Sequence, residues 1–346
     1  MDKLFEINTL PTIIAGPCSA ETETQMQETV EALSKDPRIG MIRCGVWKPR
    51  TRPGGFEGLG SKALQWISDI KKSYPQLKFC CEVARPGHVE LCLKYGINAV
   101  WIGARTSVNP FLVGELAAAL HGTDMAVMVK NPITPDVNLW IGAVERMLNA
   151  GIEDIAAVHR GFTTYNSIGF RNNPLWELPI EFKRRMPEVP LFCDPSHIAG
   201  RSEPIAALCQ TALDLHFDGL MIEAHCHPDM ALTDSTQQIT PEELSCLLDR
   251  LVLRRQKEYT PGDLLRLRDQ LEAIDAQLLE LLSRRMDISR SIGEIKRAHN
   301  MPLFQPERWQ QVLQKQIDTG RSLGLDEDFV KEISEKIHRE SLRQQE

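Results

Sequence analysis

Two groups of residues in this chain could carry chemistry, and the first is a donor set for a metal ion. A thiol, an imidazole and two carboxylates together suit a divalent transition metal. The four candidates are Cys18, His197, Glu223 and Asp234. His225 and His227 are alternative imidazole ligands because they follow Glu223 closely. Cys18 could instead be a core thiol, half of a disulfide or a nucleophile. No local spacing joins the four candidates, so the fold must bring them together.

The second group consists of basic residues that follow apolar runs of the sequence. The six cations are Arg43, Lys48, Arg50, Arg105, Lys130 and Arg160. If they share one cavity, they repel one another unless their ligand is strongly anionic. The set therefore predicts a phosphorylated and carboxylated substrate, or two such substrates. Surface salt bridges are the alternative interpretation.

Eight short apolar runs supply the elements that could bring both groups together. The runs span 11–17, 40–47, 77–83, 97–104, 125–131, 154–161, 189–195 and 219–225. Their Val, Ile, Cys and Met content is typical of strands buried on both faces, and the helix-like segments between them indicate a parallel sheet. Repeated strand–helix units of this number predict a closed (β/α)8 barrel, whose strands all end at one mouth.

The sequence predicts a break between two domains near the end of these units. TPEE (240–243) forms a capping box that opens a helix predicted over 241–257. KEYTPGD then combines proline, glycine and polar residues and is typical of a linker. We therefore expect a barrel domain over 1–256, a linker over 257–263 and an all-α domain over 264–346.

The last domain has the composition of a helical bundle. Residues 264–299 contain no proline and one glycine, with leucine and isoleucine at heptad-like spacing. Two shorter helices are predicted over 306–319 and 326–345. One very long helix and two short ones cannot close a core alone, so we expect this domain to dimerise.

The composition narrows the class of protein. The formal net charge is −7, which gives no indication of a nucleic-acid or membrane partner. No apolar run approaches the roughly 20 residues that span a bilayer, and the N-terminal sequence lacks the apolar core of a signal peptide. We expect a cytoplasmic protein in which most of the nine cysteines are free thiols.

Seven short motifs lie at or beside the ends of the predicted strands. They are GPCS (16–19), WKPRT (47–51), IGAR (102–105), VKNP (129–132), HRG (159–161), DPSH (194–197) and the segment that holds Glu223 and Asp234. In this order they resemble the short, type Iβ-like 3-deoxy-D-arabino-heptulosonate 7-phosphate (DAHP) synthases, over residues 10–235. KPRT favours this family over the related 3-deoxy-manno-octulosonate 8-phosphate synthases.

This resemblance implies a metal-dependent, aldol-like condensation of phosphoenolpyruvate with erythrose 4-phosphate and water, giving DAHP and phosphate. The implied metal ligands are the four candidates above, with Mn²⁺ or Fe²⁺ expected and Zn²⁺ or Co²⁺ as alternatives. Lys48 and Lys130 are the implied catalytic residues. The implied substrate contacts are Arg43, Lys48 and Lys130 for the phosphoenolpyruvate carboxylate, Arg105 and Arg160 for its phosphate, and Pro49, Arg50 and Thr51 for the aldose phosphate.

The tail carries a second pattern, LxxLRxxLxxID…LLxxR…IGxxK…MP…R. It resembles the all-helical (AroQ-type) chorismate mutases over residues 262–346, which implies the rearrangement of chorismate to prephenate without a metal. The implied carboxylate contacts are Arg268 (from a partner chain), Arg285, Arg308 and Ser341. Lys296 and Gln345 are implied to bind the ether oxygen as the C–O bond breaks.

Two positions in the tail depart from the mutase pattern. Trp309 stands where most relatives carry a glutamate that contacts the ring hydroxyl, and Gln305 stands where many carry an aspartate. We expect an active mutase that is slower or contacts this hydroxyl differently.

The main prediction is thus a bifunctional enzyme of aromatic amino acid biosynthesis that acts on phosphoenolpyruvate, erythrose 4-phosphate and chorismate. We expect a homo-oligomer, either a dimer through the mutase domain or a tetramer built from it. One alternative is a monofunctional synthase whose tail senses chorismate or prephenate. Another is a tail that serves dimerisation alone. Feedback of the tail's ligand on the barrel is a further hypothesis.

Overall fold

The computed structural model describes residues 3–7, 10–48, 54–165, 169–254 and 262–346. The chain divides into two compact units, Met1–Arg255 and Gln256–Glu346. Among the helices described, none has both the length and the apolar character needed to cross a bilayer.

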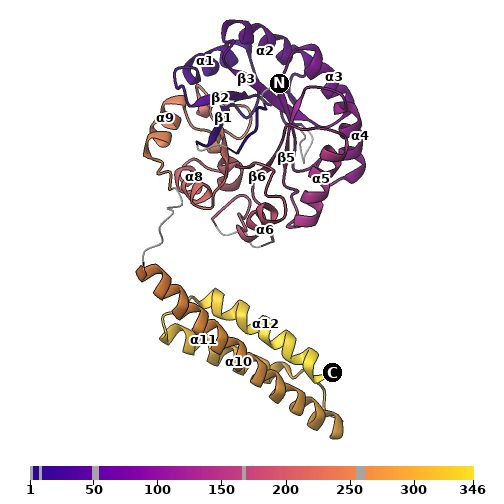
Figure 1. The fold of residues 1–346 in the computed structure, drawn as a ribbon, viewed down its shortest axis with the longest axis vertical. Coiled ribbons are helices and arrows are strands. Elements are labelled where there is room, and N and C mark those ends of the chain that lie inside the picture. Colours follow the sequence, from indigo (N-terminus) through magenta and orange to yellow (C-terminus); the bar gives the residue numbers. More distant parts are fainter. Residues whose placement is uncertain (1–2, 8–9, 49–53, 166–168, 255–261) are drawn as a thin grey trace. The chain divides into compact units, whose positions relative to one another are not determined.

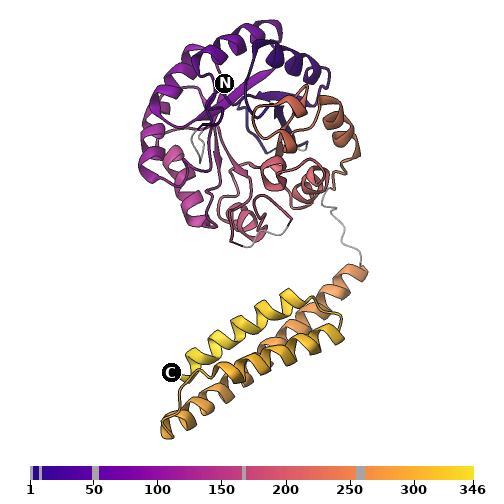
Figure 2. The same ribbon diagram turned by 180° about the vertical axis from the view of Figure 1, so that it is seen from behind.

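The first unit is a closed barrel of eight parallel strands in sequential order, and the predicted fold class is confirmed. The helices surround the strands, as Figures 1 and 2 show. The strands are β1 (Thr12–Gly16), β2 (Ile39–Arg43), β3 (Lys78–Val83), β4 (Ala99–Ile102), β5 (Ala126–Lys130), β6 (Ile155–His159), β7 (Leu191–Cys193) and β8 (Gly219–Glu223). Most of their residues are buried, because the helices cover one face and the barrel interior the other.

Helices connect successive strands of the barrel. They are α1 (Glu23–Leu33), α2 (Ser61–Ser73), α3 (Pro86–Lys94), α4 (Pro110–Leu120), α5 (Val137–Asn149), α6 (Glu177–Arg185), α7 (Pro195–Ala199) and α8 (Ile205–Asp214). After β8 follow the 3-10 turns η1 (Pro228–Met230) and η2 (Ser235–Gln237) and the helix α9 (Pro241–Arg250). Proline opens α3, α4, α7 and α9, where its missing N–H has no helical partner to lose.

Helix α9 begins at the predicted capping box but ends earlier than predicted. The Thr240 side chain and the Glu243 side chain each accept from the other's backbone. The helix was expected to continue to residue 257, but it ends at Arg250. The Gln210 side chain bonds both the N–H and the carbonyl of Val252, at 2.9 and 3.0 Å. These bonds replace the helical ones, and the chain leaves the helix.

The second unit consists of α10 (Gly262–Ala298), α11 (Pro306–Ser322) and α12 (Glu327–Gln345). Helix α12 packs against both other helices. A Cβ on Gly293 would lie 2.6 Å from the carbonyl oxygen of Gln345, so this glycine permits the close approach of α10 and α12. Within the described residues of this unit, Ile317 is the buried apolar side chain, whereas the leucines and isoleucines of α10 are largely exposed.

His159, the last residue of β6, lies in an aromatic cage near the carboxyl end of the barrel. Its ring centroid is 5.3–6.4 Å from those of Trp140, Phe162, Trp176 and Phe217. Burial, with the adjacent Arg160 charge, lowers the pKa of His159 to about 3. The imidazole therefore stays neutral in the folded protein at neutral and mildly acidic pH.

Replacing His159 by glutamine should flatten the acid side of the stability profile. The unfolded histidine titrates near ~6.5, so between that pH and about 3 the unfolded state binds a proton that the fold excludes. The resulting contribution to the free energy of unfolding is fully present above pH ~6.5. It falls by about 1.4 kcal/mol per pH unit between that pH and about 3. Urea unfolding of the barrel across this window should show a shallower fall for the variant. His216→Asn, a control at an exposed position, should keep the slope of unfolding free energy against pH of the original protein. The same slope in His159→Gln as in the original protein would contradict the prediction.

Candidate active sites

The closure of the barrel brings GPCS beside the last strand. β1 pairs with β8, and Gly16 lies opposite Glu223 in the register. A Cβ on Gly16 would lie 2.2 Å from the carbonyl oxygen of Arg43, and Gly16 has a φ of 145°. Only glycine fits this contact between the ends of β1 and β2. The contact places Cys18, two residues further on, next to the end of β8.

Three of the four predicted metal ligands meet at this end of the barrel. The donor atoms of Cys18, Glu223 and Asp234 all lie within 4.8 Å of one another. The Cys18 thiol donates to Asp234 Oδ2 at 3.2 Å. Asp234 has a left-handed backbone (φ 49°), which aspartate tolerates better than most residues. Among the described residues, the alternative ligands His225 and His227 do not belong to this group.

His197, the fourth predicted ligand, lies beside this group of donor atoms but outside it. Asp194 Oδ1 accepts from the His197 amide at 3.1 Å, and Asp194 Oδ2 lies 2.8 Å from His197 Nδ1. His197 Nε2 lies 3.7 Å from Glu223 Oε1. A metal-ligating imidazole usually has its other nitrogen fixed in this way, so the orientation is suitable for Nε2 ligation.

Two buried cations line the same end of the barrel. Arg43 ends β2 and donates to Glu223 Oε1 at 2.8 Å, and Lys130 ends β5 and donates to Asp194 Oδ2 at 2.6 Å. Both lie near the Trp101 ring, at 5.3 and 5.5 Å from its centroid. Arg43 Nε and Nη1 have no hydrogen-bond partner within the part of the chain that is described. These buried donors can accommodate an anion.

Lys48 links the predicted anion site to the metal-type donors. Its Nζ donates to Cys18 Sγ at 2.9 Å and to the Cys18 carbonyl at 3.0 Å. Burial and the charge of Glu223 raise the pKa of the Cys18 thiol to about 12, whereas a metal-bound thiol is held as thiolate. Three predicted substrate contacts lie outside the described residues: Pro49, Arg50 and Thr51.

A cluster of guanidinium groups surrounds Arg160. Burial, together with the charges of Arg171 and Arg105, lowers the pKa of Arg160 to about 10, although Asp194 opposes this. Arg160 Nη1 donates to Asn172 Oδ1 at 2.7 Å. Arginines close enough to lower one another's pKa favour binding of a dianion such as phosphate.

Sequence analysis missed Arg171 and Asn172. They follow the HRG motif by about ten positions in the loop before α6, whereas the prediction considered only strand ends. Arg171 Nη1 donates to Asp234 Oδ1 at 3.0 Å and to Gln237 Oε1 at 2.6 Å. Burial opposes ionisation of Asp234, but the charges of Arg171, His197 and Lys48 together outweigh it and lower the pKa of this carboxyl.

The second unit brings together two pairs of predicted mutase residues. Lys296 Nζ donates to Gln345 Oε1 at 2.9 Å, and Arg285 donates to Ser341 Oγ. Ser341 and Gln345 are buried on the face of α12 that meets α10. The pairs therefore form one polar seam between the two helices.

The remaining predicted mutase residues, Arg268 and Arg308, are exposed. Sequence analysis missed His338, whose ring stacks on Trp309 at 3.9 Å between centroids. Burial, with the Arg285 and Lys296 charges, lowers the pKa of His338, so the imidazole lies near both predicted cations. His338 lies three residues before Ser341 on α12, so both side chains share one face of the helix, and this spacing could have identified it.

A closed β/α barrel that gathers metal-type donors and buried cations at the carboxyl ends of its strands, followed by an all-α unit, is typical of a two-part enzyme. The chain belongs to the DAHP synthetase I family, whose sequence model matches residues 8–256. Residues 267–346 match the chorismate mutase type II model. Both motif-based family predictions are confirmed.

Individual relatives agree with these matches. Phospho-2-dehydro-3-deoxyheptonate aldolase of Thermotoga maritima is 28% identical over 66% of this chain and 65% of its own length. A crystal structure of the DAHP synthase from that organism superposes with a TM-score of 0.62 at 27% identity, covering 70% of this chain and 68% of that one. A 4-amino-4-deoxychorismate mutase of Streptomyces pristinaespiralis is 38% identical over 22% of this chain and 60% of its own length. The match thus spans less than two thirds of either curated relative.

Removing the Arg43 guanidinium should destabilise the barrel strongly. Arg43→Met leaves the buried Glu223 carboxylate without its closest cation, which costs about 3–5 kcal/mol in comparable buried pairs. Urea unfolding of the barrel should show this loss. Arg184→Ala, which breaks the exposed pair with Glu181, should cost far less. Equal costs for the two variants would show that Arg43 does not balance buried charge.

Proposed function

We propose that the barrel condenses phosphoenolpyruvate with erythrose 4-phosphate and water to give DAHP and phosphate. The observation that carries this proposal is the meeting of metal-type donors with two buried cations, one of which, Arg43, has N–H groups without a hydrogen-bond partner among the described residues. Cys18, Glu223 and Asp234 form the donor group. Arg43 donates to Glu223, and Lys130 donates to the neighbouring Asp194. Membership of the DAHP synthetase I family supports the same reaction.

We infer that Cys18, His197, Glu223 and Asp234 hold one divalent metal ion. One sulfur, one imidazole and two carboxylates fit Mn²⁺ or Fe²⁺, with Zn²⁺ and Co²⁺ as alternatives. Bound there, the metal supplies a Lewis acid for the aldehyde of the aldose phosphate. Asp194 fixes the His197 ring through Nδ1 and leaves Nε2 for ligation.

The cations would bind and orient the substrates. Arg43, Lys48 and Lys130 would bind the phosphoenolpyruvate carboxylate, a role supported by the contact that each makes with Glu223, Cys18 or Asp194. Arg160 and Arg105 would take the phosphate, and the newly found Arg171 lies near enough to assist. Holding both ends of one small anion fixes the face from which its enol carbon attacks. Arg50 and Thr51 remain proposed contacts of the aldose phosphate.

Metal removal should separate the two activities of the full chain. Chelation by EDTA should abolish DAHP formation, because the barrel reaction needs a Lewis acid, while prephenate formation continues. Adding Mn²⁺ back should restore the synthase. Both rates are measured on one preparation, by phosphoenolpyruvate consumption and chorismate loss. An equal fall in both rates would contradict the division of chemistry.

We propose that the second unit rearranges chorismate to prephenate, which links the chain to the first and a branch-point step of aromatic amino acid biosynthesis. Lys296 Nζ lies 2.9 Å from Gln345 Oε1. The two side chains are therefore close enough for both to bind the ether oxygen of chorismate. Arg285 and Ser341 form an adjacent pair for a carboxylate. A pericyclic reaction needs only orientation and stabilisation of this developing charge. Arg308 and a second chain's Arg268 would complete the site.

The exposed apolar residues of α10 support a second copy of the chain as partner. They are Leu264, Leu265, Leu267, Leu271, Ile274, Leu278, Leu279, Leu281, Ile288, Ile292 and Ile295, each at least 41% exposed. An apolar helix of this kind gains most by packing on another helix. We propose a dimer through the mutase unit, or a tetramer built from such dimers.

Lys296→Ala should lower the mutase kcat by about 10²-fold or more, since it removes a charge aimed at the breaking bond. DAHP synthesis should be unchanged. Arg290→Ala is a matched control on α10, because its cation is exposed and pairs with Asp287. Full mutase activity in Lys296→Ala would contradict the assigned role. If the original chain forms no prephenate at saturating chorismate, the tail is a sensor or a dimerisation module.

A further inference from the structure

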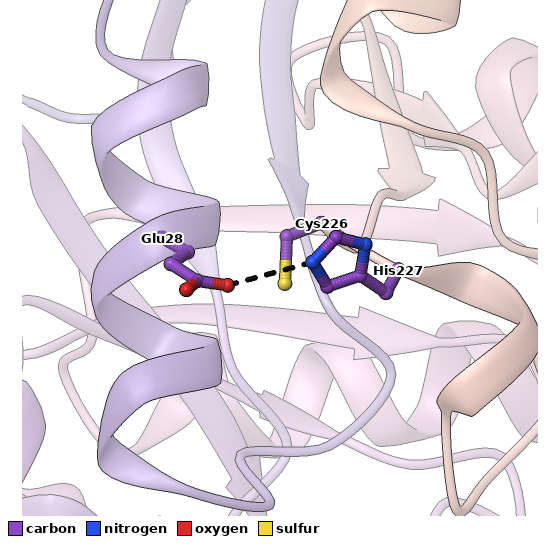
Figure 3. Close-up of side chains that lie close together, drawn as sticks. All are labelled: Glu28, Cys226 and His227. Carbon is purple, nitrogen blue, oxygen red and sulfur yellow. Dashed lines mark ion pairs between the residues drawn. The ribbon is translucent and has the colours of Figure 1, made fainter.

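A second group of metal-binding side chains lies apart from the donors around Cys18. Glu28 is on α1, and Cys226 and His227 are in the loop that follows β8. One donor atom of each lies within 4.8 Å of the other two. In Figure 3 the Cys226 sulfur points into the space between the Glu28 carboxylate and the His227 ring.

We propose that Glu28, Cys226 and His227 form a second metal site, for a thiophilic divalent cation of the Zn²⁺ class. Thiolate and imidazole are ligands that Zn²⁺ prefers, and a carboxylate commonly completes a three-residue set. Three protein ligands leave a fourth position for water. The site shares no residue with the barrel site assigned above.

The spacing of the three side chains fits tetrahedral coordination. Ligand bonds of roughly 2.0–2.3 Å place donor atoms about 3.4–3.7 Å apart. His227 Nε2 and Glu28 Oε2 are 3.7 Å apart, so this pair already has the required separation. The Cys226 sulfur, within 4.8 Å of both, needs to move by only about 1 Å.

The backbone around Cys226 is held in place by other groups. The Cys226 amide donates to Thr29 Oγ1 at 3.2 Å, and this hydroxyl donates to the Gln25 carbonyl at 2.7 Å. The His227 amide donates to His225 Nδ1 at 2.8 Å. The loop is therefore fastened to α1 and to its own preceding residue, which presents the thiol and the imidazole to Glu28.

The stability that these three side chains contribute to the fold does not explain why they lie together. The Glu28 and His227 side chains are 51% and 64% exposed, and an ion pair so exposed adds little to stability. Helix α1 is anchored instead by buried Met26, Val30 and Leu33. Glu28 and His227 are thus accessible to a cation from solvent, and Cys226 is partly buried beside them.

A cation at this position would have a structural consequence for the barrel site. The loop that carries Cys226 and His227 runs from Glu223 to Asp234, which are both proposed barrel ligands. Binding would fasten this loop to α1 without using a donor of the barrel site. It would also raise the resistance of the fold to unfolding, as any ligand of the native state does.

Zn²⁺ stoichiometry of the full chain tests the proposal. Metal-stripped protein dialysed against Zn²⁺ alone should bind two equivalents, and Cys226→Ser should bind one. His227→Asn should weaken the second equivalent by at least about tenfold. Cys246→Ser, which removes an exposed thiol on α9, should still bind two. One equivalent in the original chain that Cys226→Ser retains, or two equivalents in Cys226→Ser, would overturn the proposal.

Co²⁺ spectra in a chain that lacks the barrel thiol provide an independent measurement. Cys18→Ser should retain a thiolate-to-Co²⁺ charge-transfer band, and Cys18→Ser/Cys226→Ser should lose it. Absence of the band in Cys18→Ser, or its persistence in the double variant, would overturn the proposal. If Cys18→Ser does not fold, Zn²⁺ binding by Asp234→Asn replaces it, with one equivalent expected and none contradicting the site. Unchanged DAHP synthesis by Cys226→Ser would show that its fold is intact.

Discussion

The parallel pairing of β1 with β8 is the contact on which the barrel site depends. Cys18 and Asp234 are 216 positions apart in the chain, yet the thiol donates to the carboxylate. Closure produces this contact, because it places the end of the first strand opposite the end of the last. In an open sheet these two ends would lie at opposite edges. The same closure brings Arg43, on the second strand, to Glu223 on the eighth.

Charge balance explains how so many ionised groups remain buried together. Each carboxylate of the site has a cation of its own: Arg43 for Glu223, Lys130 for Asp194 and Arg171 for Asp234. Pairing repays the desolvation that burial costs, and it keeps the carboxylates ionised and able to bind a cation. Yet the hydrogen bonding is incomplete, since Arg43 Nε and Nη1 have no hydrogen-bond partner among the described residues, although Nη1 lies 3.8 Å from Asp194 Oδ2. An anion can therefore accept from these nitrogens without breaking an existing hydrogen bond.

The periodicity of the sequence was sufficient to predict the barrel, because strands buried on both faces are continuously apolar. The strand ends then indicated Arg43, Lys130 and Glu223 as candidate site residues, which the structure brings to the same end of the barrel. Residues positioned by tertiary contacts alone could not be found in this way. Arg171 reaches the site from a loop, and helix α9 is shortened by Gln210, a residue more than thirty positions upstream. Cys226 and His227 become a cluster only because α1 places Glu28 beside them.

Two glycines in neighbouring strands differ in what they contribute to this site. At Gly40 in β2, an added Cβ would meet nothing within 4 Å, and the φ of this residue is not in the positive range. At Gly16 in β1, the same methyl group would collide with the backbone of Arg43. A substitution at Gly40 should therefore cost little, whereas a substitution at Gly16 would displace the Cys18 thiol and the Arg43 guanidinium together. One residue without a side chain thus sets the positions of both the thiol and the guanidinium.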